Sequence, residues 1–315
     1  MASVQTAQSI QSLIANVETV ILGKTEVVRL AVATLLAGGH LLIEDVPGVG
    51  KTMLARALAK SLDCTFKRIQ FTPDLLPGDI TGVSVYNQST RQFEFRPGPV
   101  FANVVLADEI NRATPKSQSA LLESMDEFQV TVDGVTHCLP RPFFVIATQN
   151  LIEHEGTFRL PEAQLDRFLA RISLGYPGPR DEVQMLTEQA LRHPIELVEP
   201  VLAPEELEEL QNTVRRVHLA ESLKEYAVSL TRATRDHPAV ELGASPRGSI
   251  ALMRLGQALA AVHERDYVIP DDIKYVAPAA LAHRLILAPG VAFQGTSAGE
   301  VVSDVLARIA LPLAG

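Results

Sequence analysis

The stretch His40–Thr52, HLLIEDVPGVGKT, decides the fold, because a short apolar run leads directly into a turn that contains two glycines. The apolar run predicts a buried strand, and the apolar residues after Thr52 recur with the period of a helix. Backbone N–H groups in such a turn can surround a phosphate, and the following helix directs its positive end at the anion. The order of strand, glycine turn and helix therefore predicts a phosphate-binding loop.

Two side chains of this loop suit a nucleotide with its metal. Lys51 would reach the outer phosphates, and the Thr52 hydroxyl would ligate Mg²⁺. Asp45 stands where the strict pattern GxxxxGK[ST] has its first glycine, so an ordinary turn with a surface lysine is the alternative. The surrounding strand and helix favour the nucleotide, and we expect ATP and Mg²⁺ to bind here. The expected binding residues are Pro47, Gly48, Val49, Gly50, Lys51, Thr52 and Met53.

Strands and helices alternate through the first half of the chain. Thr114 and Pro115 suit the start of a helix through Asp126, and apolar runs predict four more strands. Strands buried on both faces with helices between them indicate a parallel sheet, so the predicted fold class is α/β. The four runs are 66–69, 104–107, 143–148 and 171–174.

Two segments interrupt this alternation and predict β-hairpins. Residues 83–95 alternate at period two around a polar turn, and Asp133-Gly134 lies between two further β-type runs. From Gly175 onward prolines punctuate helical stretches, and no strand is predicted. We expect a sheet domain over residues 1–178 that binds the nucleotide, and a smaller all-helical domain over residues 179–315.

Acidic and amide side chains follow the predicted strands. Asp108 would hold Mg²⁺ through water, and Glu109 would activate the attacking water, which favours hydrolysis over phosphoryl transfer. Two acids that merely end a strand are the alternative. Asn150 would orient the water, although a simple turn asparagine explains it equally well. Gln70 ends the second strand and either holds Glu109 inactive until a partner binds or has only a structural role.

Two arginines complete the candidate site. Arg247 follows Ser245-Pro246, an N-cap and first-turn pair, so it opposes the helix dipole at a cost of about 0.3–1 kcal/mol. A phosphate near Arg247 would neutralise that charge, whereas a solvated arginine is the alternative. Arg167 lies shortly before the fifth strand, where an arginine on its own is more often a surface salt-bridge partner.

Composition argues against several classes of protein. The 315 residues include 28 basic and 37 acidic side chains, and the net charge of −9 disfavours nonspecific nucleic-acid binding. The longest apolar stretch, Ala31–Ile43, is shorter than the roughly 18 residues that a membrane span needs. No signal peptide is visible, and Cys64 and Cys138 lie far apart. We therefore expect a cytoplasmic protein with no disulfide framework and no zinc site.

Several blocks of sequence together resemble the MoxR family of AAA+ ATPases, and the resemblance covers nearly the whole chain. Leu151 and Arg159 depart from the family pattern at positions where proline is common, which would retune loop geometry without removing a catalytic group. The blocks are EDVPGVGKT (Glu44–Thr52), FTPDLLPGDITG (Phe71–Gly82), FEFRPGPVFANVVLADEINRA (Phe93–Ala113), VIATQN (Val145–Asn150), EGTFRLPEAQLDRF (Glu155–Phe168) and SPRGS (Ser245–Ser249).

The resemblance implies a role for each candidate residue within one chain. Gly48–Thr52 would be the Walker A motif, and Asp108 with Glu109 the Walker B motif. Asn150 would be sensor 1, and Arg247 would be sensor 2 in a helical lid. The two hairpins would be the helix-2 insert and the pre-sensor-1 insert of the family. The residues expected to border the adenine, by position only, are Val20, Ile21 and Gly23.

The resemblance also implies an assembly and a kind of partner. Arg167 would be an arginine finger that acts on the nucleotide of the neighbouring subunit in a ring, typically a hexamer. ATP turnover in such a ring would remodel a partner protein, as a chaperone does. That partner is often a protein with a von Willebrand factor A domain.

Three alternatives stay open at this point. A chelatase ATPase subunit would use the same fold to drive metal insertion. A nucleic-acid ring motor would also carry inserted hairpins, but the tip at Asp133-Gly134 has no basic residue between Gln129 and His137 to meet phosphates. A nucleotide-gated binding module that barely hydrolyses ATP is the third alternative, and Glu109 weighs against it.

Overall fold

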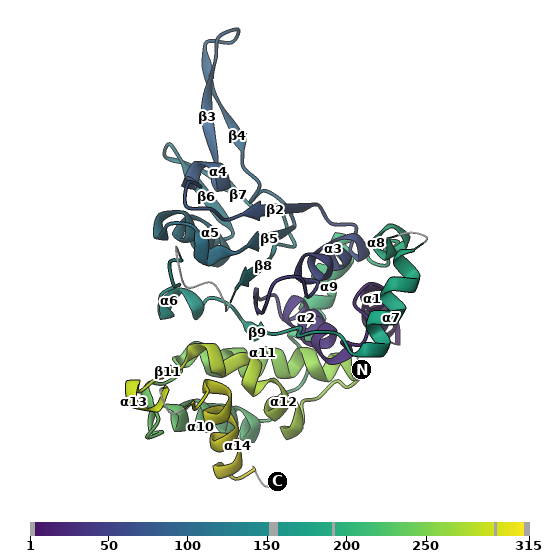
Figure 1. The fold of residues 1–315 in the computed structure, drawn as a ribbon, viewed down its shortest axis with the longest axis vertical. Coiled ribbons are helices and arrows are strands. Elements are labelled where there is room, and N and C mark those ends of the chain that lie inside the picture. Colours follow the sequence, from purple (N-terminus) through teal and green to yellow (C-terminus); the bar gives the residue numbers. More distant parts are fainter. Residues whose placement is uncertain (1–3, 151–156, 191–192, 293–294, 312–315) are drawn as a thin grey trace.

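Five parallel strands form the central sheet, in the order β2–β5–β8–β1–β9 (Figure 1). The computed structural model describes residues 4–150, 157–190, 193–292 and 295–311. The predicted parallel sheet is confirmed, and the carboxyl ends of β1, β5 and β8 lie at one edge of it. The bounds are β1 (Leu41–Glu44), β2 (Phe66–Gln70), β5 (Val104–Asp108), β8 (Phe144–Gln149) and β9 (Ala170–Ile172).

Both faces of the sheet are buried, as the continuous apolar strands require. Along β5, Val104 and Leu106 join one hydrophobic cluster, while Val105 and Ala107 join a second one on the opposite face. The first cluster includes α1 (Val4–Glu18), α2 (Thr25–Leu36) and α3 (Lys51–Ser61), and the second includes α4 (Pro77–Thr81) and α5 (Pro115–Glu127). The short helices η1 (Ile110–Arg112) and α6 (Glu162–Leu165) follow β5 and β8 along the chain.

Both predicted hairpins are present, as antiparallel strand pairs. At the second turn Asp133 has φ 51° and Gly134 has φ 80°, the two positive values that a type I′ turn requires. The first hairpin extends well beyond the body of the molecule (Figure 1). The strands are β3 (Gly82–Asn87), β4 (Gln92–Pro97), β6 (Gln129–Val132) and β7 (Val135–Cys138).

The described part of the chain after β9 is mainly helical, but it also contains a strand pair that the sequence did not predict. Val240–Leu242 (β10) and Ile286–Leu287 (β11) form a small antiparallel pair, and each is too short to show a period-two pattern. The helices are α7 (Pro179–Gln189), α8 (Pro194–Leu197), α9 (Pro204–Val214), α10 (Glu221–Arg235), α11 (Pro246–Val262), α12 (Pro270–Leu281), η2 (Ala282–Arg284), α13 (Pro289–Ala292) and α14 (Ala298–Arg308).

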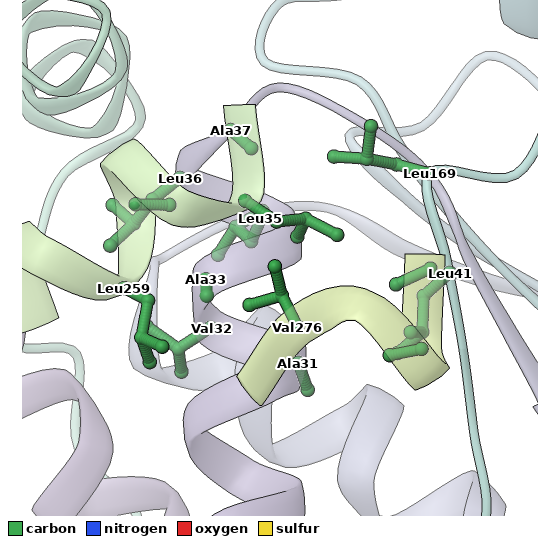
Figure 2. Packing of buried hydrophobic residues seen from close by; sticks show 14 of the residues in the cluster. Ala31, Val32, Ala33, Leu35, Leu36, Ala37, Leu41, Leu169, Leu259 and Val276 are labelled. Atoms are coloured by element: carbon green, nitrogen blue, oxygen red, sulfur yellow. The ribbon is translucent and has the colours of Figure 1, made fainter. Parts of the chain in front are cut away.

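Helix α2 connects the sheet to the later helices. Figure 2 shows Val32 and Leu35 of α2 among Leu259 of α11 and Val276 of α12. The same cluster contains Leu41 of the central strand, and all five side chains are at most 1% exposed. The sheet and the helices that follow it therefore share one continuous apolar core.

Candidate active site

The loop between β1 and α3 has the backbone of a phosphate-binding turn. Gly48 has φ 83° and Gly50 has φ 96°, a left-handed conformation that costs other residues about 1–2 kcal/mol. Apart from the chain neighbours of Gly48, no described residue has a heavy atom within 4 Å of the point where a Cβ at Gly48 would stand, so this side of the loop has room for a ligand. Gly50 caps α3, so the first turn of this helix, with its free N–H groups, begins at this loop.

Lys51 is held at the edge of the sheet beside this loop. Its Nζ donates to the carbonyl oxygen of Asp45 at 2.8 Å and lies 3.5 Å from that of Gln149. Burial lowers the pKa of Lys51, while the carboxylates of Asp45, Asp108 and Glu109 oppose the shift. A partly desolvated ammonium group suits an anionic phosphate, since it has little hydration to lose.

Asp45 takes the place of a glycine for a structural reason that the sequence did not reveal. Its buried carboxylate accepts from the backbone N–H of Val46 at 2.8 Å, from Ser173 Oγ at 2.9 Å and from the N–H of Gly175 at 2.7 Å. Desolvation raises the pKa of Asp45, but these hydrogen bonds outweigh it and lower the pKa. Asp45 thus anchors the loop to the segment that leads out of the sheet.

The acidic pair at the end of β5 is organised around Thr148 of the neighbouring strand. The Thr148 hydroxyl donates to Asp108 Oδ1 at 2.6 Å and accepts from the N–H of Glu109 at 2.8 Å. Glu109 has φ 56° and ψ 50°, a strained conformation for a glutamate that is typical of functional positions. Arg68 donates to Asp108 Oδ2 through Nη2 at 2.6 Å. Thr148 and Arg68 were not singled out from the sequence.

The Glu109 carboxylate is held by two donors. Gln70 Nε2 donates to Glu109 Oε2 at 2.7 Å, and Arg112 Nη1 lies 3.1 Å from the same oxygen. Arg68 Nη2 donates to Gln70 Oε1 at 2.8 Å, which fixes the orientation of the Gln70 amide. The contact between Gln70 and Glu109, raised as one interpretation of the sequence, is therefore present.

Asn150 follows β8 directly and is buried. Its chain neighbour Gln149 lies beside Lys51, so Asn150 is at the same edge of the sheet as the phosphate-binding loop. Leu151, one of the two departures from the family pattern, lies outside the described residues. Arg159, the other departure, is exposed.

The structure brings Arg167 and Arg247 together, although they are 80 positions apart. Arg167 Nη1 lies 3.2 Å and Arg247 Nη2 lies 3.3 Å from the same oxygen, Oδ2 of Asp126. Arg167 also donates to the carbonyl oxygen of Leu122. Both arginines are partly exposed, at 29% and 51% of the side chain, so both can exchange these contacts for a ligand.

A cavity of about 570 Å³ adjoins the phosphate-binding loop. Val20 and Ile21, expected near the adenine, line it together with Val49 and Met53. Gly23 packs against α7 instead, where a Cβ would stand 2.0 Å from Asp181 Oδ2. Lining residues that the sequence did not indicate include Tyr176, Pro177, Met185 and Leu186.

The residues present fit a magnesium nucleotide. The Thr52 hydroxyl and the Asp108 carboxylate are oxygen donors of the kind that Mg²⁺ prefers. Within the described ranges, no group of three or more His, Cys, Asp or Glu residues could hold a metal ion by itself. Cys64 and Cys138 are free thiols. No described helix is both long enough and apolar enough to cross a membrane.

Comparisons with known proteins agree with this geometry. Residues 40–170 match the ATPase family associated with various cellular activities (AAA), and residues 232–305 match the AAA lid domain. Chaperone MoxR1 of Mycobacterium tuberculosis is 42% identical over 313 residues, covering 96% of this chain and 82% of the relative. The uncharacterized protein YeaC of Bacillus subtilis is 56% identical over 298 residues, covering 95% and 93%.

A solved structure and a more distant relative complete the comparison. A Cytophaga hutchinsonii protein assigned as an ATPase superposes with a TM-score of 0.91 at 39% identity, covering 98% of this chain and 96% of that one. A magnesium-chelatase subunit of Arabidopsis thaliana is 27% identical over 248 residues, 76% of this chain and 55% of the relative. The parallel sheet, the helical lid and these likenesses agree: the chain belongs to the MoxR family of AAA+ ATPases.

Proposed function

We propose that this ATPase works as a ring in which Mg²⁺-dependent ATP hydrolysis remodels a partner protein. The convergence of Lys51, Asp108, Glu109 and Asn150 at the carboxyl ends of three neighbouring strands carries the proposal. In it, residues 1–178 hold the nucleotide and residues 179–315 form the lid.

Each residue has a separate task in this proposal. Lys51 binds the outer phosphates, and the Thr52 hydroxyl would hold Mg²⁺ directly and Asp108 through water. The metal when bound neutralises charge on the phosphates. Glu109 accepts the proton of the attacking water, which Asn150 orients. The N–H of Glu109 donates to the Thr148 hydroxyl, and this contact supports a fixed backbone position for Glu109 during proton transfer.

The charge that develops on the transferred phosphoryl group needs a further cation. Arginine fingers are worth about 10³–10⁵ in rate in systems where they have been measured. We propose that Arg167 supplies this charge in trans to the neighbouring subunit of a hexamer, and that Arg247 reads the nucleotide in cis. Both arginines contact Asp126, which supports the idea that Asp126 holds them while neither is bound to a nucleotide.

A protein partner agrees with the surface of the projecting hairpin. Val83, Tyr86 and Phe93 are 48%, 49% and 74% exposed, and exposed apolar side chains of this size favour contact with another protein. We propose a partner with a von Willebrand factor A domain. The chelatase alternative uses the same ATP chemistry, and coupled ATPase assays with either type of partner would separate the two.

Two substitutions test the assigned chemistry. Glu109→Gln should bind ATP with near wild-type affinity but lose at least about 10² in kcat, since a positioned base contributes 10²–10⁴. Lys51→Ala should instead weaken ATP binding in an equilibrium titration. Glu123→Gln, which changes an exposed glutamate of α5, is the matched control and should leave both quantities unchanged. Near wild-type turnover of Glu109→Gln would contradict the proposal.

A further inference from the structure

Arg284 is a buried lid arginine that none of the tasks above employs. It ends η2, and its side chain is only 3% exposed, although it carries a full charge. A guanidinium group is rarely buried unless carboxylates and carbonyl groups satisfy its donors. The location of those acceptors therefore indicates what Arg284 holds in place.

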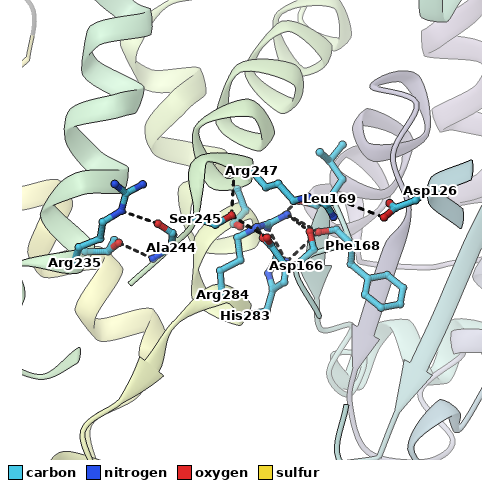
Figure 3. Close-up of polar contacts among 12 residues, drawn as sticks. Asp126, Asp166, Phe168, Leu169, Arg235, Ala244, Ser245, Arg247, His283 and Arg284 are labelled. Atoms are coloured by element: carbon cyan, nitrogen blue, oxygen red, sulfur yellow. Dashed lines mark hydrogen bonds and ion pairs between the residues drawn. The ribbon is translucent and has the colours of Figure 1, made fainter. Parts of the chain in front are cut away.

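Arg284 has acceptors on both sides of Arg167 in the chain. Nε donates to Asp166 Oδ1 at 2.7 Å, and Nη2 donates to the carbonyl oxygens of Asp166 at 3.2 Å and Phe168 at 2.7 Å. Nη1 reaches toward the carbonyl of Leu169 at 3.5 Å. Nη1 also donates to the carbonyl oxygen of Ala280 inside the lid and lies 2.7 Å from His283 Nε2. Figure 3 shows Arg284 beside Asp166 and Phe168, so one lid side chain binds the backbone on both sides of Arg167.

A second lid contact joins the same segment to the start of α11. Ser245 Oγ donates to Asp166 Oδ2 at 2.8 Å and also accepts from the N–H of Arg247 at 3.1 Å. Both oxygens of Asp166 are therefore occupied by the lid. Any displacement of the first turn of α11 acts directly on the residue that precedes Arg167.

We infer that Arg284 is a positioning residue for Arg167, through which the lid of one subunit sets the finger that this subunit offers to its neighbour. The inference depends on the trans role of Arg167 proposed above. When Arg247 leaves Asp126 for a nucleotide, the lid contacts at Ser245 and Arg284 transmit the change to the segment 166–169. The nucleotide state of one subunit thereby affects hydrolysis in the next.

The test uses Arg284→Lys, which keeps the charge but loses the fork that spans several acceptors. The variant should bind ATP within about twofold of wild type and lose at least tenfold in ATPase rate. Arg265→Lys is the matched control, because Arg265 makes a comparable two-point pair with buried Asp272 entirely inside the lid. That control should keep its ATPase rate. A comparable loss in Arg265→Lys would show that general lid stability, and not the position of the finger, explains the result for Arg284→Lys.

Mixed rings separate positioning from a merely structural defect. Arg284→Lys subunits have an intact base but a misplaced finger, so co-assembly with Glu109→Gln subunits should restore up to about one quarter of wild-type turnover. That fraction is the share of interfaces that pair an intact base with an intact finger in a random ring. Co-assembly with Arg167→Ala subunits, which also lack a working finger, should restore nothing.

The reference mixture of Arg167→Ala with Glu109→Gln makes the outcomes distinguishable. If this reference stays inactive, the trans role of Arg167 fails and the inference falls with it. If the reference recovers but Arg284→Lys with Glu109→Gln does not, Arg284 does not position the finger, while the proposed function stands. Recovery of Arg284→Lys with Arg167→Ala would also overturn the inference.

Ser245→Ala covers the case in which Arg284→Lys does not fold. It removes the hydrogen bond to Asp166 together with the N-cap bond from the N–H of Arg247, and leaves the buried arginine in place. We expect a loss of about two- to fivefold in ATPase rate with the same pattern of recovery in mixed rings. A normal rate, or recovery with both mixing partners, would contradict the role of this contact.

Discussion

Replacing Gln70 with alanine should raise the ATPase rate in the absence of any partner. The Gln70 amide donates to Glu109 Oε2 at 2.7 Å, and the carboxylate must give up this bond before it can turn to an attacking water. A hydrogen bond to a charged group contributes about 1.5–3 kcal/mol when it is buried. Because the Glu109 side chain is 24% exposed, solvent weakens the bond, and we assign about 1–2 kcal/mol to the hydrogen bond between Gln70 and Glu109.

That range corresponds to an increase of about 5–30-fold in kcat, since 1.36 kcal/mol is tenfold in rate. KM for ATP should change little, because Gln70 makes its described contacts with Arg68 and Glu109 rather than at the phosphate-binding loop. The measurement is steady-state hydrolysis at saturating magnesium and ATP. Arg112→Ala is the control. The Arg112 side chain is 44% exposed, so its ion pair with Glu109 is weak and its removal should raise kcat by less than about fivefold.

The hydrolysis rate of Gln70→Ala decides whether Gln70 restrains Glu109. If Gln70→Ala hydrolyses ATP at the wild-type rate or more slowly, the hydrogen bond does not restrain the base. Gln70 would then have only the structural role that the sequence left open, as a link between Arg68 and Glu109.

Two further predictions concern the lid and the stability of the sheet. Arg247→Ala should reduce the difference in lid position between ATP-like and ADP states, measured as a distance between labels on α5 and α11; an unchanged difference would favour a solvated arginine. His40, which accepts from the N–H of Val145 at Nδ1, has its pKa lowered to about 4 by burial, so folding favours the neutral ring. Below pH 6.5 the ring takes up a proton more readily in the unfolded chain than in the folded one. The contribution of His40 to the free energy of unfolding is therefore complete above pH 6.5 and should fall by about 3 kcal/mol toward pH 4. His40→Gln should flatten that part of the pH profile in denaturant titrations, and identical slopes for both proteins would contradict the prediction.

The sequence predicted the parts of this structure that local patterns encode. The glycine turn at Gly48 and Gly50, the acids that end β5 and the turn at Asp133-Gly134 each depend on neighbours within a few positions. Their geometry follows from backbone preferences and strand ends, so the pattern is readable without tertiary contacts.

Residues that act through distant partners could not be found in this way. Asp45 looked like a lost glycine because two donors to its carboxylate, the Ser173 hydroxyl and the N–H of Gly175, lie about 130 positions away. Arg284 reaches Asp166 across 118 positions, and no local period marks a side chain used for that purpose. Arg68 likewise occupies an alternating position in β2 that an ordinary surface arginine would fill equally well.

The position of α2 between the sheet and the lid affects both the unfolding of the protein and the range of lid rotation. Val32 and Leu35 lie in the hydrophobic cluster shared by Leu41 of β1 and Val276 of α12, so separating the two halves would expose apolar side chains of this cluster in each of them. A fragment that ended before α10 would leave this helix uncovered and would be expected to aggregate. Heating should accordingly melt the sheet and the lid in one cooperative step, and lid rotation during turnover must be small enough to keep α2 covered on both sides.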